Sequence, residues 1–250
     1  INHNNITLFV RDSNNIKLTG GVSLNNILPS GVSIATSNSK KGNSTLTTFT
    51  DKTKVINQTV RDFSKISNIV QTLIIFLISL LVPTFLGNLI KTIFGAESVI
   101  TSNTQIIVGS IVNTALITAA INLKGWSKIL GIVTMPSVST ILSGYVFKSA
   151  SPYMAWMIPA IWAGNLALIY SYKYLMVNKK KNYWIASVVG IVIKVAIIAL
   201  IFMVLKGIGI FPEKLVNNLQ KAMTYTQAIT ASIGAVIAFI IYKTETISKD

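Results

Sequence analysis

The segment Pro152–Tyr174, PYMAWMIPAIWAGNLALIYSYKY, predicts a helix that crosses a membrane. Roughly 20 predominantly apolar residues are enough to cross the hydrocarbon core of a bilayer. Aromatic side chains prefer the level of the lipid headgroups. They stand near both ends of this segment, at Tyr153, Trp156, Tyr170, Tyr172 and Tyr174. We therefore expect a transmembrane helix over residues 153–176.

One polar residue, Asn165, lies between the two aromatic belts of this segment. An amide in hydrocarbon needs a hydrogen-bond partner, so Asn165 is expected to face other helices or a cavity rather than lipid. Pro159 is expected to kink the helix, and Ala160-x-x-x-Gly164 offers a small face for close helix packing. Two interpretations remain open, a helix that lines a ligand cavity and a packing helix with a polar clamp.

The composition indicates an all-α polytopic membrane protein. Of the 250 residues 51% are hydrophobic and 12% are charged, and the mean hydropathy is +0.61. The net charge of +15 is spread over a polar tail and short loops, which fits the positive-inside bias of membrane proteins. We therefore expect a lipid bilayer, and no nucleic acid, as a partner.

The sequence argues against an enzyme and against a metal site built by the protein. It contains no cysteine and one histidine, His3, in the polar tail. Disulfides, cysteine-ligated metals and histidine clusters are thereby excluded. The sequence also has no phosphate-binding glycine loop and no nucleophile constellation. We expect no catalytic residue, no cofactor and no metal ligand.

The chain divides into a polar segment over residues 1–64 and a transmembrane domain over 65–250. The polar segment is rich in Asn, Ser, Thr and Lys, and it is interpreted either as partly β-structured or as disordered. Six apolar spans follow at 66–90, 105–122, 129–147, 153–176, 184–205 and 222–242. With six spans both termini share one side, and the basic residues place that side in the cytoplasm of a cell-membrane protein.

Lys194 is the strongest single indication of a functional site. It falls inside the fifth span, where a lysine costs about 2.5–3.5 kcal/mol on insertion scales, so it is expected to point inward. No acidic residue occurs in any predicted span. The lysine is therefore expected either to bind an anionic group of a ligand or to be satisfied by Asn and backbone oxygens of neighbouring helices.

The loop before the sixth span is a second candidate surface. Phe211, Tyr225 and Gln227 combine aromatic and amide groups there, as a cap over a pocket requires. An ordinary amphipathic turn at the membrane interface is the alternative interpretation.

Several strings in this sequence resemble those of a known group of membrane proteins. They are VGSIVNTALITAA, MPSVSTILSGYVF, PYMAWMIPAIWAGNLALIYSY, KNYW and TQAITASIGAVIAFIIYK. In order and spacing they resemble small six-span proteins of anaerobic Gram-positive bacteria that look like substrate-binding S components of energy-coupling-factor (ECF) transporters. Such proteins sometimes carry the label "iron hydrogenase", which a sequence without cysteine contradicts.

The resemblance implies a substrate-binding membrane subunit that captures a vitamin-like or metal-chelate small molecule. It implies a pocket in the outer half of the bundle, with Trp156, Asn165, Lys194 and Gln227 at ligand-facing positions. An ECF coupling subunit and ABC-type ATPases are the implied partners. One departure is that residues 66–90 lack the Ala-x-x-x-Ala docking motif. The alternative is a non-catalytic structural or assembly subunit of a larger membrane complex.

Overall fold

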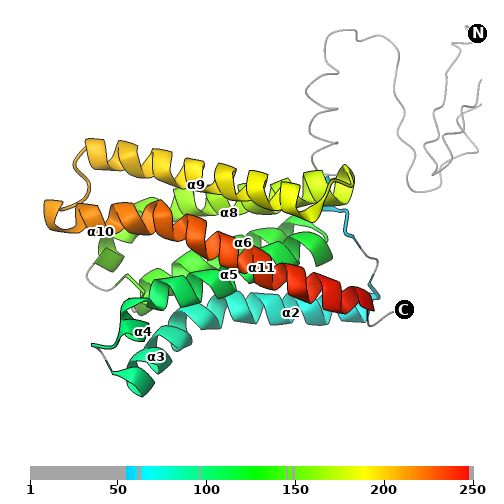
Figure 1. Cartoon of the computed structure of the whole chain (residues 1–250), viewed down its shortest axis with the longest axis horizontal. Coiled ribbons are helices and arrows are strands. Elements are labelled where there is room, and N and C mark those ends of the chain that lie inside the picture. Colours follow the sequence, from blue (N-terminus) through cyan, green and yellow to red (C-terminus); the bar gives the residue numbers. More distant parts are fainter. Residues whose placement is uncertain (1–54, 61–62, 96, 145, 148–149, 248–250) are drawn as a thin grey trace, which may run out of the picture. The chain divides into compact units, whose positions relative to one another are not determined.

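The computed structural model describes residues 55–60, 63–95, 97–144, 146–147 and 150–247. Most of the polar segment 1–64, expected to be partly β-structured or disordered, lies outside this range. Its described residues, 55–60 and 63–64, contain a short helical turn and no strand. Within the whole described range every regular element is helical, and no strand occurs among the described residues. The predicted all-α fold is therefore confirmed for this part of the chain (Figure 1).

Five helical stretches are long and apolar enough to cross a membrane. They are Lys65–Phe94, Thr104–Asn122, Ser151–Asn178, Tyr183–Gly207 and Glu213–Glu245. The remaining predicted span, 129–147, corresponds to α6 (Trp126–Ser143), which contains Pro136 and several hydroxyl side chains. The five helices indicate a multi-pass membrane protein, and a sixth crossing stays a prediction.

The first span is a continuous but irregular helix. It consists of α2 (Lys65–Leu81), a π-helical turn η2 (Val82–Leu86) and α3 (Gly87–Phe94). Pro83 stands in this π-helical turn, because proline has no N–H for the regular ladder. Many large apolar side chains of α2 are exposed on the outer face, as for a helix that contacts lipid.

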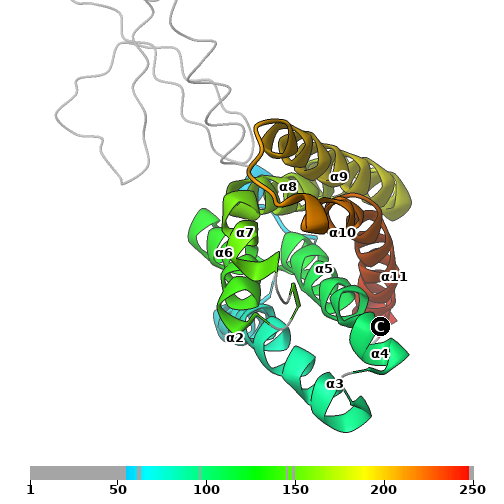
Figure 2. The same cartoon turned by 90° about the vertical axis from the view of Figure 1, so that its left-hand side faces the viewer.

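Helix α5 (Thr104–Asn122) lies in the middle of the bundle (Figure 2). Around it lie α2, α6, α8 (Ile158–Ser171), α9 (Tyr183–Gly207) and α11 (Tyr225–Ile247). Helix α5 packs in parallel along α11. The two backbones approach closely at Gly234, where an added Cβ would lie 2.6 Å from Cβ of Asn113, and at Gly109, where it would lie 2.8 Å from Thr230. These glycines set the α5–α11 distance.

The segment Pro152–Tyr174 is less regular than expected. It forms α7 (Ser151–Met154), a 3₁₀ turn η4 (Ala155–Met157), α8 (Ile158–Ser171) and a π-helical end η5 (Tyr172–Asn178). Pro159 stands in the first turn of α8, directly after the 3₁₀ turn, so the irregularity expected at this proline lies on its N-terminal side. The 3₁₀ turn precedes the proline because Pro159 has no N–H to offer Ala155 O, which accepts from Ile158 N instead.

Small residues let α8 pack closely against α9 (Tyr183–Gly207), which runs antiparallel to it. A Cβ on Gly164 would lie 2.9 Å from the Ile198 side chain, and one on Gly190 would lie 3.0 Å from Leu168. The predicted small face at Ala160 and Gly164 is therefore used in this contact. Both residues are buried.

Helix α6 is held to its neighbours by hydroxyl groups. Ser139 Oγ donates to Leu80 O at 2.5 Å and also contacts the Thr84 hydroxyl, which ties α6 to the first span. On the other side, Trp162 Nε1 donates to Ser137 Oγ at 2.7 Å, which ties α6 to α8. These polar ties compensate for the low hydropathy of the helix.

Short elements close the two ends of the bundle. At one end, called here the α10 end, lie α4 (Val99–Ser102) and α10 (Glu213–Met223). The opposite end, called the Lys173 end, is where α5 and α11 finish and α9 begins. There Lys173, with 0% exposure, donates to Gln58 O and Leu123 O, both at 2.7 Å. Ile56 is also fully buried, so residues 55–60 belong to the helical domain.

Candidate functional site

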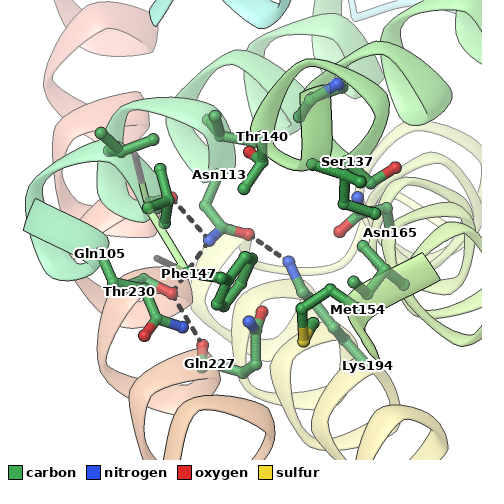
Figure 3. A pocket seen from close by; sticks show the side chains of 17 residues that line it. Gln105, Asn113, Ser137, Thr140, Phe147, Met154, Asn165, Lys194, Gln227 and Thr230 are labelled. Atoms are coloured by element: carbon green, nitrogen blue, oxygen red, sulfur yellow. Dashed lines mark hydrogen bonds between the residues drawn. The ribbon is translucent and has the colours of Figure 1, made fainter. Parts of the chain in front are cut away.

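A small cavity opens inside the bundle towards the α10 end. Its volume is about 80 Å³. Side chains from α5, α6, α8, α9 and α11 and from the α6–α7 connection meet there (Figure 3). The polar lining residues are Gln105, Asn113, Ser137, Thr140, Asn165, Lys194, Gln227 and Thr230.

Lys194 is buried in the protein interior beside this cavity. Its exposed fraction is 2%, and its Nζ donates to Oδ1 of Asn113 at 2.5 Å. The lysine thus points inward, as the sequence predicted. Its partner is an asparagine of a neighbouring helix, the arrangement expected for a lysine satisfied within the bundle. An ammonium has three N–H groups and Asn113 accepts one of them.

The orientation of the Asn113 amide follows from its other contacts. Its Nδ2 donates to Gly109 O at 2.8 Å and to Thr230 Oγ1 at 3.2 Å. The amide oxygen is therefore directed to Lys194, which can only donate. The chain of contacts links α9, α5 and α11, and Figure 3 shows it along one wall of the cavity.

The other two predicted residues that reach the cavity are amides. Asn165 is 3% exposed, and its Nδ2 approaches Val133 O at 3.5 Å, a long hydrogen bond. Gln227 is half-buried at the start of α11, and its Nε2 donates to Ala222 O at 3.3 Å. Gln105 of α5 donates to the same carbonyl at 3.4 Å. The structure thus brings Asn165, Lys194 and Gln227 together around one cavity.

The structure does not bring Trp156 to the cavity. This side chain is 58% exposed and lies in the turn η4, where the helical register differs from that of a continuous helix. Phe211 stacks on Phe202 instead of covering the cavity, with ring centroids 5.2 Å apart, and Tyr225 is 69% exposed. Of the cap residues expected in this loop only Gln227 lines the cavity, and the rest of the loop forms α10.

Several lining residues were not selected from the sequence as site residues. They are Gln105, Asn113, Ser137, Thr140, Phe147, Met154 and Thr230. The polar residues among them could have been recognised in the same way as Asn165, as amide or hydroxyl side chains within apolar helices. Asn113 and Thr230 are of this kind, whereas nothing in the sequence marks Phe147 and Met154.

The cavity can donate hydrogen bonds and offer positive charge. None of its lining residues is acidic, and one is a buried amine. Throughout the described part of the chain, no three His, Cys, Asp or Glu side chains lie close enough to hold a metal ion. The arrangement therefore suits a polar or anionic solute group. Comparisons with models of protein families, with curated proteins and with solved structures find no match to this chain.

Proposed function

We propose that this protein is the substrate-binding membrane subunit of an ECF-type uptake transporter for a vitamin-like or metal-chelate small molecule. The observation that carries the proposal is Lys194, a buried amine on the wall of an internal cavity. Burying a charge is costly. A carboxylate or phosphate group of a ligand could accept a charge-assisted hydrogen bond from the same amine, and Lys194 would then bind the ligand.

The topology that goes with this proposal has six spans and both termini in the cytoplasm. Its support is the alternation of direction along the chain. Helix α6 runs parallel to α2, because Lys128 bonds Asn68 near their starts and Ser139 bonds Leu80 further along. Helices α5 and α11 run the other way. The Lys173 end then faces the cytoplasm, and the cavity opens towards the outside of the cell.

The cavity is smaller than the pockets that bind vitamin-sized ligands. Pockets for vitamin-sized ligands measure roughly 300–1,000 Å³. A cavity of about 80 Å³ holds a few water molecules. Under this proposal the cavity must therefore widen to admit its ligand. Phe147 and Met154 line the cavity from the α6–α7 connection and from α7, so they are the side chains expected to move outward.

Native purification tests the proposal. The full chain is expressed with an affinity tag in its own host and purified in mild detergent, and co-purifying proteins and small molecules are identified by mass spectrometry. We expect ABC-type ATPases and a coupling subunit, together with one enriched small molecule. Lys194→Met and Gln227→Leu should lose the small molecule and keep the proteins. Trp156→Phe, which changes an exposed side chain away from the cavity, is the matched control and should keep both.

The alternative is a non-catalytic structural or assembly subunit of a larger membrane complex. A specific observation favours it, because Lys194 already has a hydrogen-bond partner and the cavity is small. Under this alternative other membrane proteins co-purify in fixed ratio, ATPases are absent and no small molecule is enriched. That result would reject the transport proposal.

A further inference from the structure

A second cavity lies at the Lys173 end, between the start of α9 and the end of α11. Its volume is about 400 Å³, several times that of the internal cavity. Lysines and aromatic residues dominate its lining, and none of the lining residues that the structure describes is acidic. The proposed uptake function makes no use of it.

One wall of this cavity consists of packed aromatic rings. Tyr183 contacts Phe239 with ring centroids 5.0 Å apart, and Trp184 contacts Phe239 at 4.9 Å. The Tyr183 hydroxyl donates to Ala235 O at 2.6 Å, which fixes the buried tyrosine to α11. Trp184 is 43% exposed, so part of this wall faces the surroundings of the bundle.

The rim of the cavity carries three lysines, two from a connection between helices and one from a helix. Lys180 and Lys181 belong to the connection between η5 and α9, and Lys243 stands on α11. The connection is held by a backbone hydrogen bond from Lys181 N to Leu175 O at 2.8 Å. Lys243 Nζ lies 5.7 Å from the centre of the Phe239 ring, over the aromatic wall. Positive charge and aromatic surface therefore meet at one place.

We propose that this cavity binds the phosphate headgroup of an anionic phospholipid. Basic pockets between transmembrane helices at the cytoplasmic face suit such headgroups. The apolar surface next to the cavity is suited to acyl chains, since Val188 of α9 is 62% exposed and Ile240 of α11 is 58% exposed. A lipid is favoured over free phosphate, because only a lipid uses the charged rim, the Trp184 ring and this apolar surface at once.

The experiment measures thermal stability and lipid affinity of the full purified chain. Wild type is titrated with phosphatidylglycerol or phosphatidylcholine in mixed micelles, and separately with inorganic phosphate. We expect phosphatidylglycerol alone to raise the Tm. Replacing Lys180, Lys181 and Lys243 together by Gln should abolish this rise and weaken the affinity for phosphatidylglycerol by roughly a hundredfold, at about 1 kcal/mol for each lysine.

A matched control removes the same charge elsewhere. Replacing Lys65, Lys124 and Lys179 by Gln changes three exposed lysines that lie towards the same end and outside the cavity lining. This variant should keep the rise in Tm and most of the affinity. Equal loss in both triple variants would mean unspecific attraction of charge and would overturn the proposal.

Further measurements distinguish a phospholipid from free phosphate as the ligand and test the aromatic wall. Single variants replace the triple variant if that variant does not fold. An equal Tm rise with inorganic phosphate would show that the cavity takes a free anion, and would overturn the lipid assignment. Trp184→Leu should weaken binding of phosphatidylglycerol about tenfold, whereas an unchanged affinity would contradict the role of the aromatic wall. If the triple variant does not fold, the single variants Lys181→Gln and Lys243→Gln are compared with Lys179→Gln in the same titration, and equal affinities would reject the site.

Discussion

The hydrogen bond between Lys194 and Asn113 predicts an unequal response to removal of its two members. Asn113→Leu leaves the buried Lys194 ammonium without the acceptor seen in the structure, and losing the hydrogen bond of a buried charged group costs about 3 kcal/mol. Lys194→Met leaves only a neutral amide oxygen unsatisfied, at about 1–3 kcal/mol. It also removes a charge whose placement in a span costs about 2.5–3.5 kcal/mol. The cost of the unsatisfied amide oxygen and the gain from removing the charge therefore nearly cancel.

We therefore expect Asn113→Leu to lower the Tm of the ligand-free protein by roughly 10 °C, at about 2–4 °C per kcal/mol for a chain of this size. Lys194→Met should change it by a few degrees at most. The double variant should be more stable than the sum of the single effects predicts, by about 2 kcal/mol, because no unpaired charge remains in it. Thermal unfolding of the four proteins in one detergent measures this coupling.

The matched control is Asn165→Leu, another buried amide on the same cavity. Its hydrogen bond to Val133 O is long, at 3.5 Å, and no hydrogen bond joins Asn165 to Lys194. It should cost about 1 kcal/mol and combine additively with Lys194→Met. If Asn113→Leu is no more destabilising than Lys194→Met, or if the pair is additive like the control, the Lys194–Asn113 hydrogen bond does not have the energetic role assigned to it.

Three other predictions concern the rest of the domain. Gly234→Ala should destabilise the α5–α11 contact by about 1–3 kcal/mol in thermal unfolding, whereas Gly207→Ala, whose Cβ would meet no atom within 4 Å, should have little effect. Lys173→Met should leave two buried carbonyls unsatisfied, and hydrogen exchange over residues 55–60 should accelerate; unchanged protection would show that Lys173 does not hold this segment. Because the chain has no cysteine, Lys180→Cys should react with an impermeant thiol reagent only after the membrane is opened, and Asn217→Cys should react in intact cells. The opposite pattern would reverse the proposed orientation.

The sequence was sufficient to predict most helices and their approximate bounds. The spans predicted at 105–122 and 184–205 correspond to α5 at Thr104–Asn122 and α9 at Tyr183–Gly207. Long apolar runs specify such helices because the bilayer demands them. Helix α10 was not predicted as a helix, since it is short and lies between two spans. The sequence pointed to an irregular helix at Pro159, and the 3₁₀ turn at Ala155–Met157 lies directly before that proline.

The site was predictable only in part. A polar side chain within an apolar span can be recognised from the sequence alone. Asn165 and Lys194 were predicted on this basis to point into the protein, and both are buried. Their partners depend on how the helices turn against one another. Asn113 and Lys194 are 81 residues apart in the chain, and only the packing brings them together. Trp156 fails for the same reason, because the 3₁₀ turn changes the direction in which its ring points.

The position of α5 in the middle of the bundle has a consequence for biosynthesis. Helix α11, which packs along α5, is the last helix in this sequence to leave the ribosome. Until it arrives, Asn113 and Thr114 of α5 lack the partners that α11 supplies, Thr230 and the carbonyl of Gly234. A chain arrested before α11 would expose these groups to lipid or to the insertion machinery. Membrane quality control can recognise such groups, so incomplete copies would be removed before they reach the folded population.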